Sequence, residues 1–190
     1  MNDEVKVVKP RVRRLSISQM NKFVRSKGKE IRENQIKLTE PLFVYKRINS
    51  KVNGVVKRFV ASLVIPKGAI VNLTHESYSS EGKMRASMAF CYSIVGVRGN
   101  KDGDRLVVDS GFSLWDYSFK YYSGSSLGLT LEDFMNLSVD DPVSGSWDKK
   151  KRAALNKCKA VPMNAPFAKQ SGICAAGIHF FVEQHKAANY

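Results

Sequence analysis

Four consecutive cations, Lys149 to Arg152, form the clearest chemical feature of this sequence. Asp148 precedes them and is a favourable helix cap, so the spacing predicts a helix from Lys149 to about Lys157 with all four cations in its first turn. The helix dipole disfavours exposed cations at that end by roughly a few tenths of a kcal/mol each. A bound anion would remove this penalty, because helix N-termini bind phosphate groups readily. An ordinary solvated surface is the alternative, and the predicted anion site consists of Lys149, Lys150, Lys151 and Arg152.

The chain as a whole is basic, since 31 Lys and Arg residues stand against 17 Asp and Glu residues and leave a formal net charge of +14. A field of this sign favours polyanionic partners, either nucleic acid or an acidic protein surface. Residues 1–41 are predicted to be a basic N-terminal arm, with a short helix from Gln19 to about Lys27 that Ser18 caps. Three arginines of this arm join the predicted anion or nucleic-acid contacts: Arg11, Arg13 and Arg14.

Histidine and cysteine form no recognisable catalytic or metal-binding pattern. Cys91, Cys158 and Cys174 are far apart, and their odd number, with no secretory leader, predicts free thiols in a reducing cytosol. Cys174 is interpreted as an inert thiol, with a nucleophile as the alternative. No glycine loop stands between a strand and a helix, so no cofactor and no metal are predicted. No apolar run approaches the roughly 18 residues that cross a bilayer, and a membrane partner is not expected.

The closing segment, residues 174–190, has the pattern Cys-x-x-Gly-Ile-His-Phe-Phe-x5-Ala-x-x-Tyr. It is typical of a buried strand that leads into a short terminal helix, with His179 in mid-strand. The pattern resembles the closing motif of a domain of unknown function from giant DNA viruses and large phages. Shorter matches occur upstream in the same order, at 44–46, 61–69, 82–87 and 119–124. The resemblance covers about residues 42–190 and implies a viral, phage-type protein with a compact domain, without an activity to carry over.

A second resemblance concerns the same residues. Gly177 to Phe181, followed by Lys186 to Tyr190, is similar to the Gly-Ile-Tyr-Phe-Ala and Lys-Ser-Ala-Asn-Tyr segment of the poly(ADP-ribose) polymerase type of ADP-ribosyltransferase. The tyrosine of that family stacks on nicotinamide, so the resemblance implies a nucleotide or NAD cleft around Tyr45, His179 and Tyr190. The chain departs from the family because Tyr45-Lys46-Arg47 replaces a His-Gly pair, and because it ends before a strand that would bring a catalytic Glu. A hydrogen-bonded core histidine is the alternative for His179.

Strand-like alternation begins after the arm. Leu42–Ile48 and Val55–Ile65 predict a hairpin, and Met84–Val97 alternates between two faces as one further strand. A capping box predicts a short helix over 130–137. These elements predict an α+β fold with a mainly antiparallel sheet, two or three short helices and the basic N-terminal arm, the domain itself covering 42–190.

The sequence therefore predicts a viral, phage-type, non-enzymatic binding or structural protein. It would use the arm and the cation run to hold nucleic acid or an acidic partner in a particle, another assembly or a homo-oligomer, in the host cytoplasm or the virion. An ADP-ribosyltransferase-like nucleotide or NAD-binding protein or enzyme is the alternative, and an inhibitor of a host defence protein is a further one. Catalytic residues are assigned only in the enzyme alternative, where they are His179, Tyr45 and Tyr190.

Overall fold

The computed structural model describes residues 15–52, 55–73, 82–96, 108–109, 120–139, 149–160 and 177–189. The helices are α1 (Ile17–Arg25), α2 (Leu131–Met135), α3 (Lys149–Cys158) and α4 (Gln184–Asn189), and η1 (Ser125–Leu127) is a 3-10 turn. The strands are β1 (Gly28–Arg32), β2 (Gln35–Leu38), β3 (Leu42–Val52), β4 (Val55–Ile65), β5 (Ile70–Asn72), β6 (Met84–Ala86), β7 (Ala89–Gly96), β8 (Val108–Asp109), β9 (Lys120–Tyr121), β10 (Lys159–Ala160) and β11 (Ile178–Phe180).

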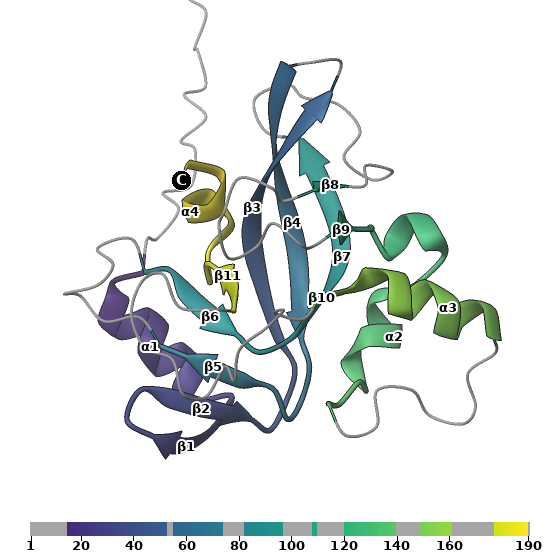
Figure 1. Ribbon diagram of the computed structural model, residues 1–190. Coiled ribbons are helices and arrows are strands. Elements are labelled where there is room, and N and C mark those ends of the chain that lie inside the picture. The colour runs from purple at the N-terminus through teal and green to yellow at the C-terminus, as the bar shows by residue number, and fades with distance from the viewer. Residues whose placement is uncertain are drawn as a thin grey trace, which may run out of the picture.

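Two sheets form the body of the protein (Figure 1). The five-stranded sheet has the order β1-β2-β5-β6-β11, and the four-stranded sheet has the order β10-β7-β4-β3. The strands of both sheets pair antiparallel throughout. The predicted α+β class with a mainly antiparallel sheet is therefore confirmed. Within the described residues, no helix is both long enough and apolar enough to span a bilayer.

The predicted hairpin is the longest feature of the fold. β3 and β4 pair without interruption from Leu42 and Ile65 to Val52 and Val55, so β3 extends beyond the predicted end at Ile48. The continuous pairing with β4 explains the extension, because each further residue of β3 gains a partner. The hairpin rises above the rest of the molecule in Figure 1.

The predicted strand over 84–97 is two strands that belong to different sheets. β6 joins the five-stranded sheet and β7 joins the four-stranded sheet. Ser87 ends β6: its hydroxyl oxygen accepts from the Ile70 amide at 2.9 Å, and its own amide donates to the Ile70 carbonyl at 2.9 Å. Alternation continues on both sides of this switch, so the sequence pattern could not show it.

Residues 15–40 belong to the folded domain, which corrects the predicted arm. Met20 and Val24 of α1 are completely buried in the main hydrophobic core, and Ile36 of β2 stands opposite Val71 of β5. The predicted boundary at 41/42 lies between β2 and β3, and both strands contribute to that core. The apolar stripe of α1 and the apolar face of β2 gain burial only against the sheets, which is why this segment is packed. Residues 1–14 lie outside the described residues.

The cap of α1 also differs from the prediction. Ser16, not Ser18, is the N-cap, and the helix begins at Ile17. The Gln19 amide donates to the Ser16 hydroxyl at 3.2 Å, and the Gln19 side chain accepts from the Ser16 amide at 2.8 Å. Ser16 is the better cap because a glutamine lies three residues after it and completes a capping box.

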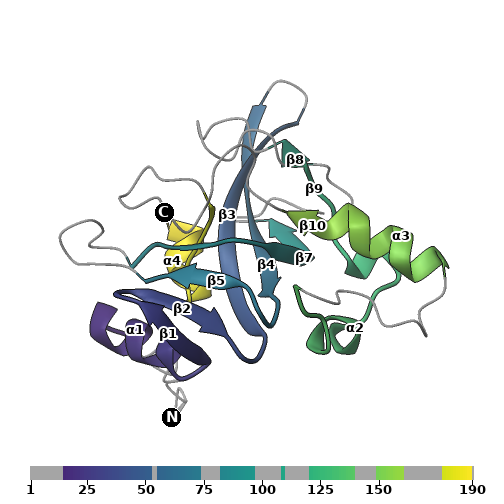
Figure 2. The ribbon, with the colours of Figure 1, turned by 60° about the horizontal axis from the view of Figure 1, so that its bottom comes forward.

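Three hydrophobic clusters hold these elements together. The main core joins α1, the five-stranded sheet and the inner face of the four-stranded sheet. A second cluster packs α2 and α3 on the other face of the four-stranded sheet, with Phe90 and Phe134 at its centre. A third, smaller cluster places Ala187 of α4 against Val60 and Phe181. Figure 2 shows α1 on one side of the hairpin and α2 and α3 on the other.

The closing segment forms the predicted strand and helix and connects the two sheets. β11 is the edge strand beside β6, and the next residue, Phe181, pairs with Tyr45 of β3. The Tyr45 amide donates to the Phe181 carbonyl at 2.9 Å, and the Phe181 amide donates to the Tyr45 carbonyl at 2.7 Å. The carboxylate of Glu183 also accepts from the Leu15 amide at 2.6 Å. The closing segment therefore connects both sheets to Leu15, two residues before α1 begins.

Candidate functional site

The predicted cation run lies where the sequence places it, in the first turn of α3. Lys149, Lys150, Lys151 and Arg152 are all exposed, and α3 ends at Cys158, one residue beyond the predicted end. The opposite side of the helix is buried through Ala154, Leu155 and Cys158 against the second cluster. This burial fixes the helix on the sheet, so the cations face solvent. Asp148, the predicted cap, lies outside the described residues.

One cation of the run is neutralised within the fold. The Lys151 ammonium lies 3.2 Å from the Asp133 carboxylate of α2. Burial favours a higher pKa for Asp133, but hydrogen bonds from the Thr130 backbone, from Lys151 and from the Thr130 side chain, together with the Lys151 charge, outweigh it and lower the pKa. Asp133 also accepts from the Thr130 amide at 2.8 Å as part of the α2 capping box. The same carboxylate thus begins α2 and holds the first turn of α3.

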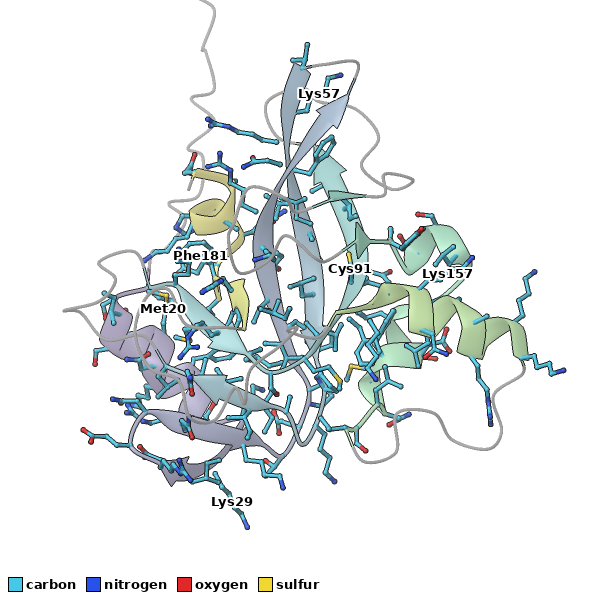
Figure 3. All side chains as sticks on the ribbon, viewed as in Figure 1. Met20, Lys29, Lys57, Cys91, Lys157 and Phe181 are labelled. Atoms are coloured by element: carbon cyan, nitrogen blue, oxygen red, sulfur yellow. The ribbon has the colours of Figure 1, made fainter. Side chains whose placement is uncertain are left out.

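The cationic surface continues along α3 into β10, and we name the exposed cations of this segment the α3 surface. Besides the run it includes Lys157 and Lys159, and residues 149–160 contain no Asp or Glu. By contrast, residues 17–40 include three acids among their cations: Glu30, Glu33 and Glu40. Lys27 lies 2.7 Å from Glu40 and Arg25 lies 3.9 Å from Glu30. Figure 3 shows Lys157 at the right of the view and Lys29 at the bottom.

Sequence reasoning missed a second basic element, the β3–β4 hairpin. Arg58 is exposed and Lys57 half-buried near the far end of the hairpin, where Figure 3 labels Lys57. The chain has no Asp or Glu between Glu40 and Glu76, and this gap in acidic residues is the signal that could have found the hairpin. Arg11, Arg13 and Arg14 of the predicted contact set lie outside the described residues.

The structure places Tyr45 on β3, paired with Phe181, and His179 on β11, two residues before Phe181 and opposite Arg85. Tyr45 is half-buried beside Val60, Phe181 and Ala187 in the third cluster. His179 is half-buried with its Nε2 atom buried, and its carbonyl accepts from the Lys46 ammonium at 3.1 Å. Tyr190, the third residue of the nucleotide alternative, lies outside the described residues. The part of the closing motif that is described therefore contributes packing and strand pairing.

The two described cysteines have free thiols and are buried. Burial raises the pKa of Cys158 to about 12, and its Sγ donates to the Ala154 carbonyl at 3.1 Å. A thiol in this state is a poor nucleophile, because the thiolate is the reactive form. Cys174 lies outside the described residues, and among the residues that are described no group of three His, Cys, Asp or Glu could hold a metal ion.

Comparison of the chain with protein-family models, with curated proteins and with solved structures found no match. The resemblances of the closing segment therefore stay predictions.

Proposed function

We propose that this protein is a non-enzymatic binding or structural protein that engages nucleic acid or an acidic protein surface through the α3 surface. The observation that carries the proposal is the exposed first turn of α3, which presents Lys149, Lys150, Lys151 and Arg152 on a segment without acids. Lysine and arginine at such a surface neutralise phosphates and release counterions, which is the main sequence-independent source of nucleic-acid affinity.

The position of the run suits an anion such as phosphate. The first turn of a helix presents backbone N–H groups and the positive end of the dipole, so a phosphate there meets both the dipole and the side-chain charges. Contacts of this kind position a protein on the phosphate backbone without reading bases. We therefore expect binding to duplex DNA of unrelated sequences with similar affinity.

The biological setting of the proposal rests on the viral resemblance of the closing segment. A phage-type protein with this surface would act in the host cytoplasm or in the virion, as part of a particle, another assembly or a homo-oligomer. Inhibition of a host defence protein is an alternative use of the same surface. The ADP-ribosyltransferase-like alternative is supported only by the resemblance of the closing segment and by the pairing of Tyr45 with Phe181, two residues after His179. It predicts a thermal shift with NAD or ADP-ribose.

Fluorescence anisotropy with labelled single- and double-stranded DNA and RNA tests the proposal at about 50 and about 200 mM salt. The informative variant combines Lys149→Ala, Lys150→Ala and Arg152→Ala, because it leaves the Lys151–Asp133 ion pair in place. Three phosphate contacts predict a loss of affinity of roughly 40-fold between the two salt concentrations, and the variant should lose most of that salt dependence.

The matched control combines Lys29→Ala, Arg32→Ala and Lys37→Ala, three exposed cations of the five-stranded sheet. It removes the same charge at another surface, so it should bind nearly as well as the unmodified chain. Equal losses of affinity in the two variants would mean that net charge alone causes the binding, and would overturn the assignment to α3. An affinity that does not depend on salt, or no binding at low salt, would overturn nucleic-acid binding itself.

A further inference from the structure

β1 is the outermost strand of the five-stranded sheet, and among the described strands only β2 pairs with it. Residues 29–32 of this strand are all exposed, so side chains on both of its faces meet solvent. Ile31, a large apolar residue, is 45% exposed. Figure 1 shows β1 at the lower margin of the sheet. A strand in this position is a template for a further strand, because its outer edge presents backbone N–H and C=O groups.

The pairing with β2 fixes which backbone groups of β1 point outward. Leu38 of β2 stands opposite Gly28. The Leu38 amide donates to the Ala69 carbonyl at 2.9 Å and its carbonyl accepts from the Gly68 amide at 2.8 Å, so both groups point away from β1. Opposed residues of antiparallel strands direct their backbone groups either toward each other or away from each other, so Gly28 directs its N–H and C=O groups outward. Glu30, two residues further on, does the same.

The charge between the two outward positions is positive. Lys29 of β1 stands directly opposite Lys37 of β2, and both lysines are exposed. The acid of β1, Glu30, projects from the other face, where it lies 3.9 Å from Arg25. Like charges in directly opposed positions of two strands destabilise the pair. A strand added at the free edge would place one residue on the other side of Lys29, and an Asp or Glu there would offset the repulsion.

Like charges oppose the pairing of β1 with a second copy of itself. In an antiparallel pair, opposed residues must both point toward the partner strand or both point away from it, which limits the registers. The registers that match positions 28 and 30 oppose Lys29 to Lys29, Glu30 to Glu30, or Lys29 to Lys27. Charged residues on edge strands prevent self-association in this way. The occupant that fits this edge is therefore a different chain.

We propose that the free edge of β1 binds an extended, acidic segment of a partner protein as an added strand. Main-chain hydrogen bonds to Gly28 and Glu30 give the affinity, and an acidic residue opposite Lys29 gives the specificity. β-Branched residues near the acid cover Ile31 and favour the extended backbone. This edge is separate from the α3 surface and does not depend on the proposed nucleic-acid binding.

Fluorescence anisotropy of the full chain with a labelled, amidated peptide, Thr-Val-Thr-Glu-Thr-Val-Thr, tests the proposal. When the glutamate stands opposite Lys29, the threonines on either side of it hydrogen-bond to Gly28 and Glu30. N-methylation of these two threonines should therefore abolish binding, whereas N-methylation of the two valines, whose N–H groups point away from β1, should not. A peptide with lysine in place of glutamate should bind more weakly. No binding of the glutamate peptide up to about 1 mM, or equal losses in the two methylated peptides, would overturn the proposal.

Two substitutions at Glu30 test whether the backbone of β1 makes the contact. Glu30→Pro removes the outward N–H group, and proline is tolerated where the N–H group of an edge strand faces solvent. Glu30→Ala removes the same side chain and keeps that N–H group, so it is the matched control. Loss of one hydrogen bond should make the peptide bind roughly three- to tenfold more weakly to Glu30→Pro than to Glu30→Ala. Equal affinities for the two variants would overturn the proposal.

Lys29→Glu decides the matter if Glu30→Pro does not fold. This variant should bind the lysine peptide more tightly than the glutamate peptide, and an unchanged preference for glutamate would overturn the proposal. A dimer in sedimentation that Lys29→Glu abolishes would also overturn it, because a second copy would then occupy the edge. The triple alanine variant of α3 should bind the peptide as the unmodified chain does, so failure of one proposal can be recognised without failure of the other.

Discussion

The α3 surface and a polar row of the five-stranded sheet differ in the surroundings of their charged groups. The polar row consists of four directly opposed residues on neighbouring strands: Gln35, Asn72, Arg85 and His179. Lys149, Lys150 and Arg152 are exposed on the first turn of a helix, while Arg85 and Lys46 are more than nine-tenths buried. An exposed cation retains its hydration, and salt screens its field over about 8 Å at physiological ionic strength. A buried cation has lost much of its hydration, and screening by salt hardly affects it.

An exposed cation and a buried cation therefore contribute to the protein in different ways. The α3 surface can add charges at little cost to stability, and its affinity for a polyanion depends on how many cations it presents. The polar row has few charges, and the interactions that these charges make depend on where the strand pairing places them. Salt should therefore weaken binding at the α3 surface steeply.

Removal of the packing beneath α3 should have the largest effect. Phe134 is completely buried and lies edge-on to Tyr92, with ring centroids 5.7 Å apart. Phe134→Ala should lower the free energy of unfolding by about 3–5 kcal/mol. The variant should also weaken nucleic-acid binding, because α2 holds the first turn of α3 through the Asp133–Lys151 ion pair. Chemical denaturation and anisotropy measure the two effects. The control is Leu131→Ala on the exposed side of α2. Its free energy of unfolding should lie within about 0.5 kcal/mol of that of the unmodified chain.

Substitution of Asp133 measures how much its carboxylate contributes to the contact between α2 and the first turn of α3. Asp133→Asn should cost about 1–2 kcal/mol at neutral pH, because the cap of α2 is weakened and the ion pair with Lys151 is lost. The pKa of Asp133 is lower in the folded state than its ordinary value of 3.8. Its contribution is therefore fully present above that value and disappears as the pH falls through the lower folded pKa.

Denaturation of Asp133→Asn at neutral pH and near pH 3 measures this dependence. The difference between the variant and the unmodified chain should shrink at the lower pH. Glu132→Gln, an exposed neighbour on the same turn, is the control and should show little difference at either pH. A constant difference for Asp133→Asn would mean that the side chain acts through packing and not through its charge.

The smallest effect on stability should come from the exposed cations themselves. The triple variant Lys149→Ala, Lys150→Ala and Arg152→Ala should change the free energy of unfolding by less than about 1 kcal/mol, because unfavourable interactions with the helix dipole are removed and alanine favours helix. Its nucleic-acid affinity should nevertheless fall at low salt. Parallel denaturation and anisotropy experiments measure both quantities. A large loss of stability would make the loss of binding an indirect effect and would remove the contrast between the two regions.

The sequence by itself determined the local features of this protein. Continuous alternation predicted the β3–β4 hairpin, the cation run predicted the position of α3, and the closing motif predicted a strand followed by a helix. All three are present because each depends on segments that are contiguous in the sequence, such as two strands joined by one turn or the i and i+4 positions of one helix. The net charge, which needs only the composition, likewise followed from the sequence.

Only the tertiary structure decided how distant segments meet. It placed residues 15–40 in the core, divided 84–97 between two sheets and brought Tyr45 to Phe181. It also assembled the polar row from four strands spread between residues 35 and 179. Each member of the row looks like an ordinary polar residue in its own strand. Their relation depends on strand order and register, which arise from burial of the apolar face of the whole sheet and have no local signature.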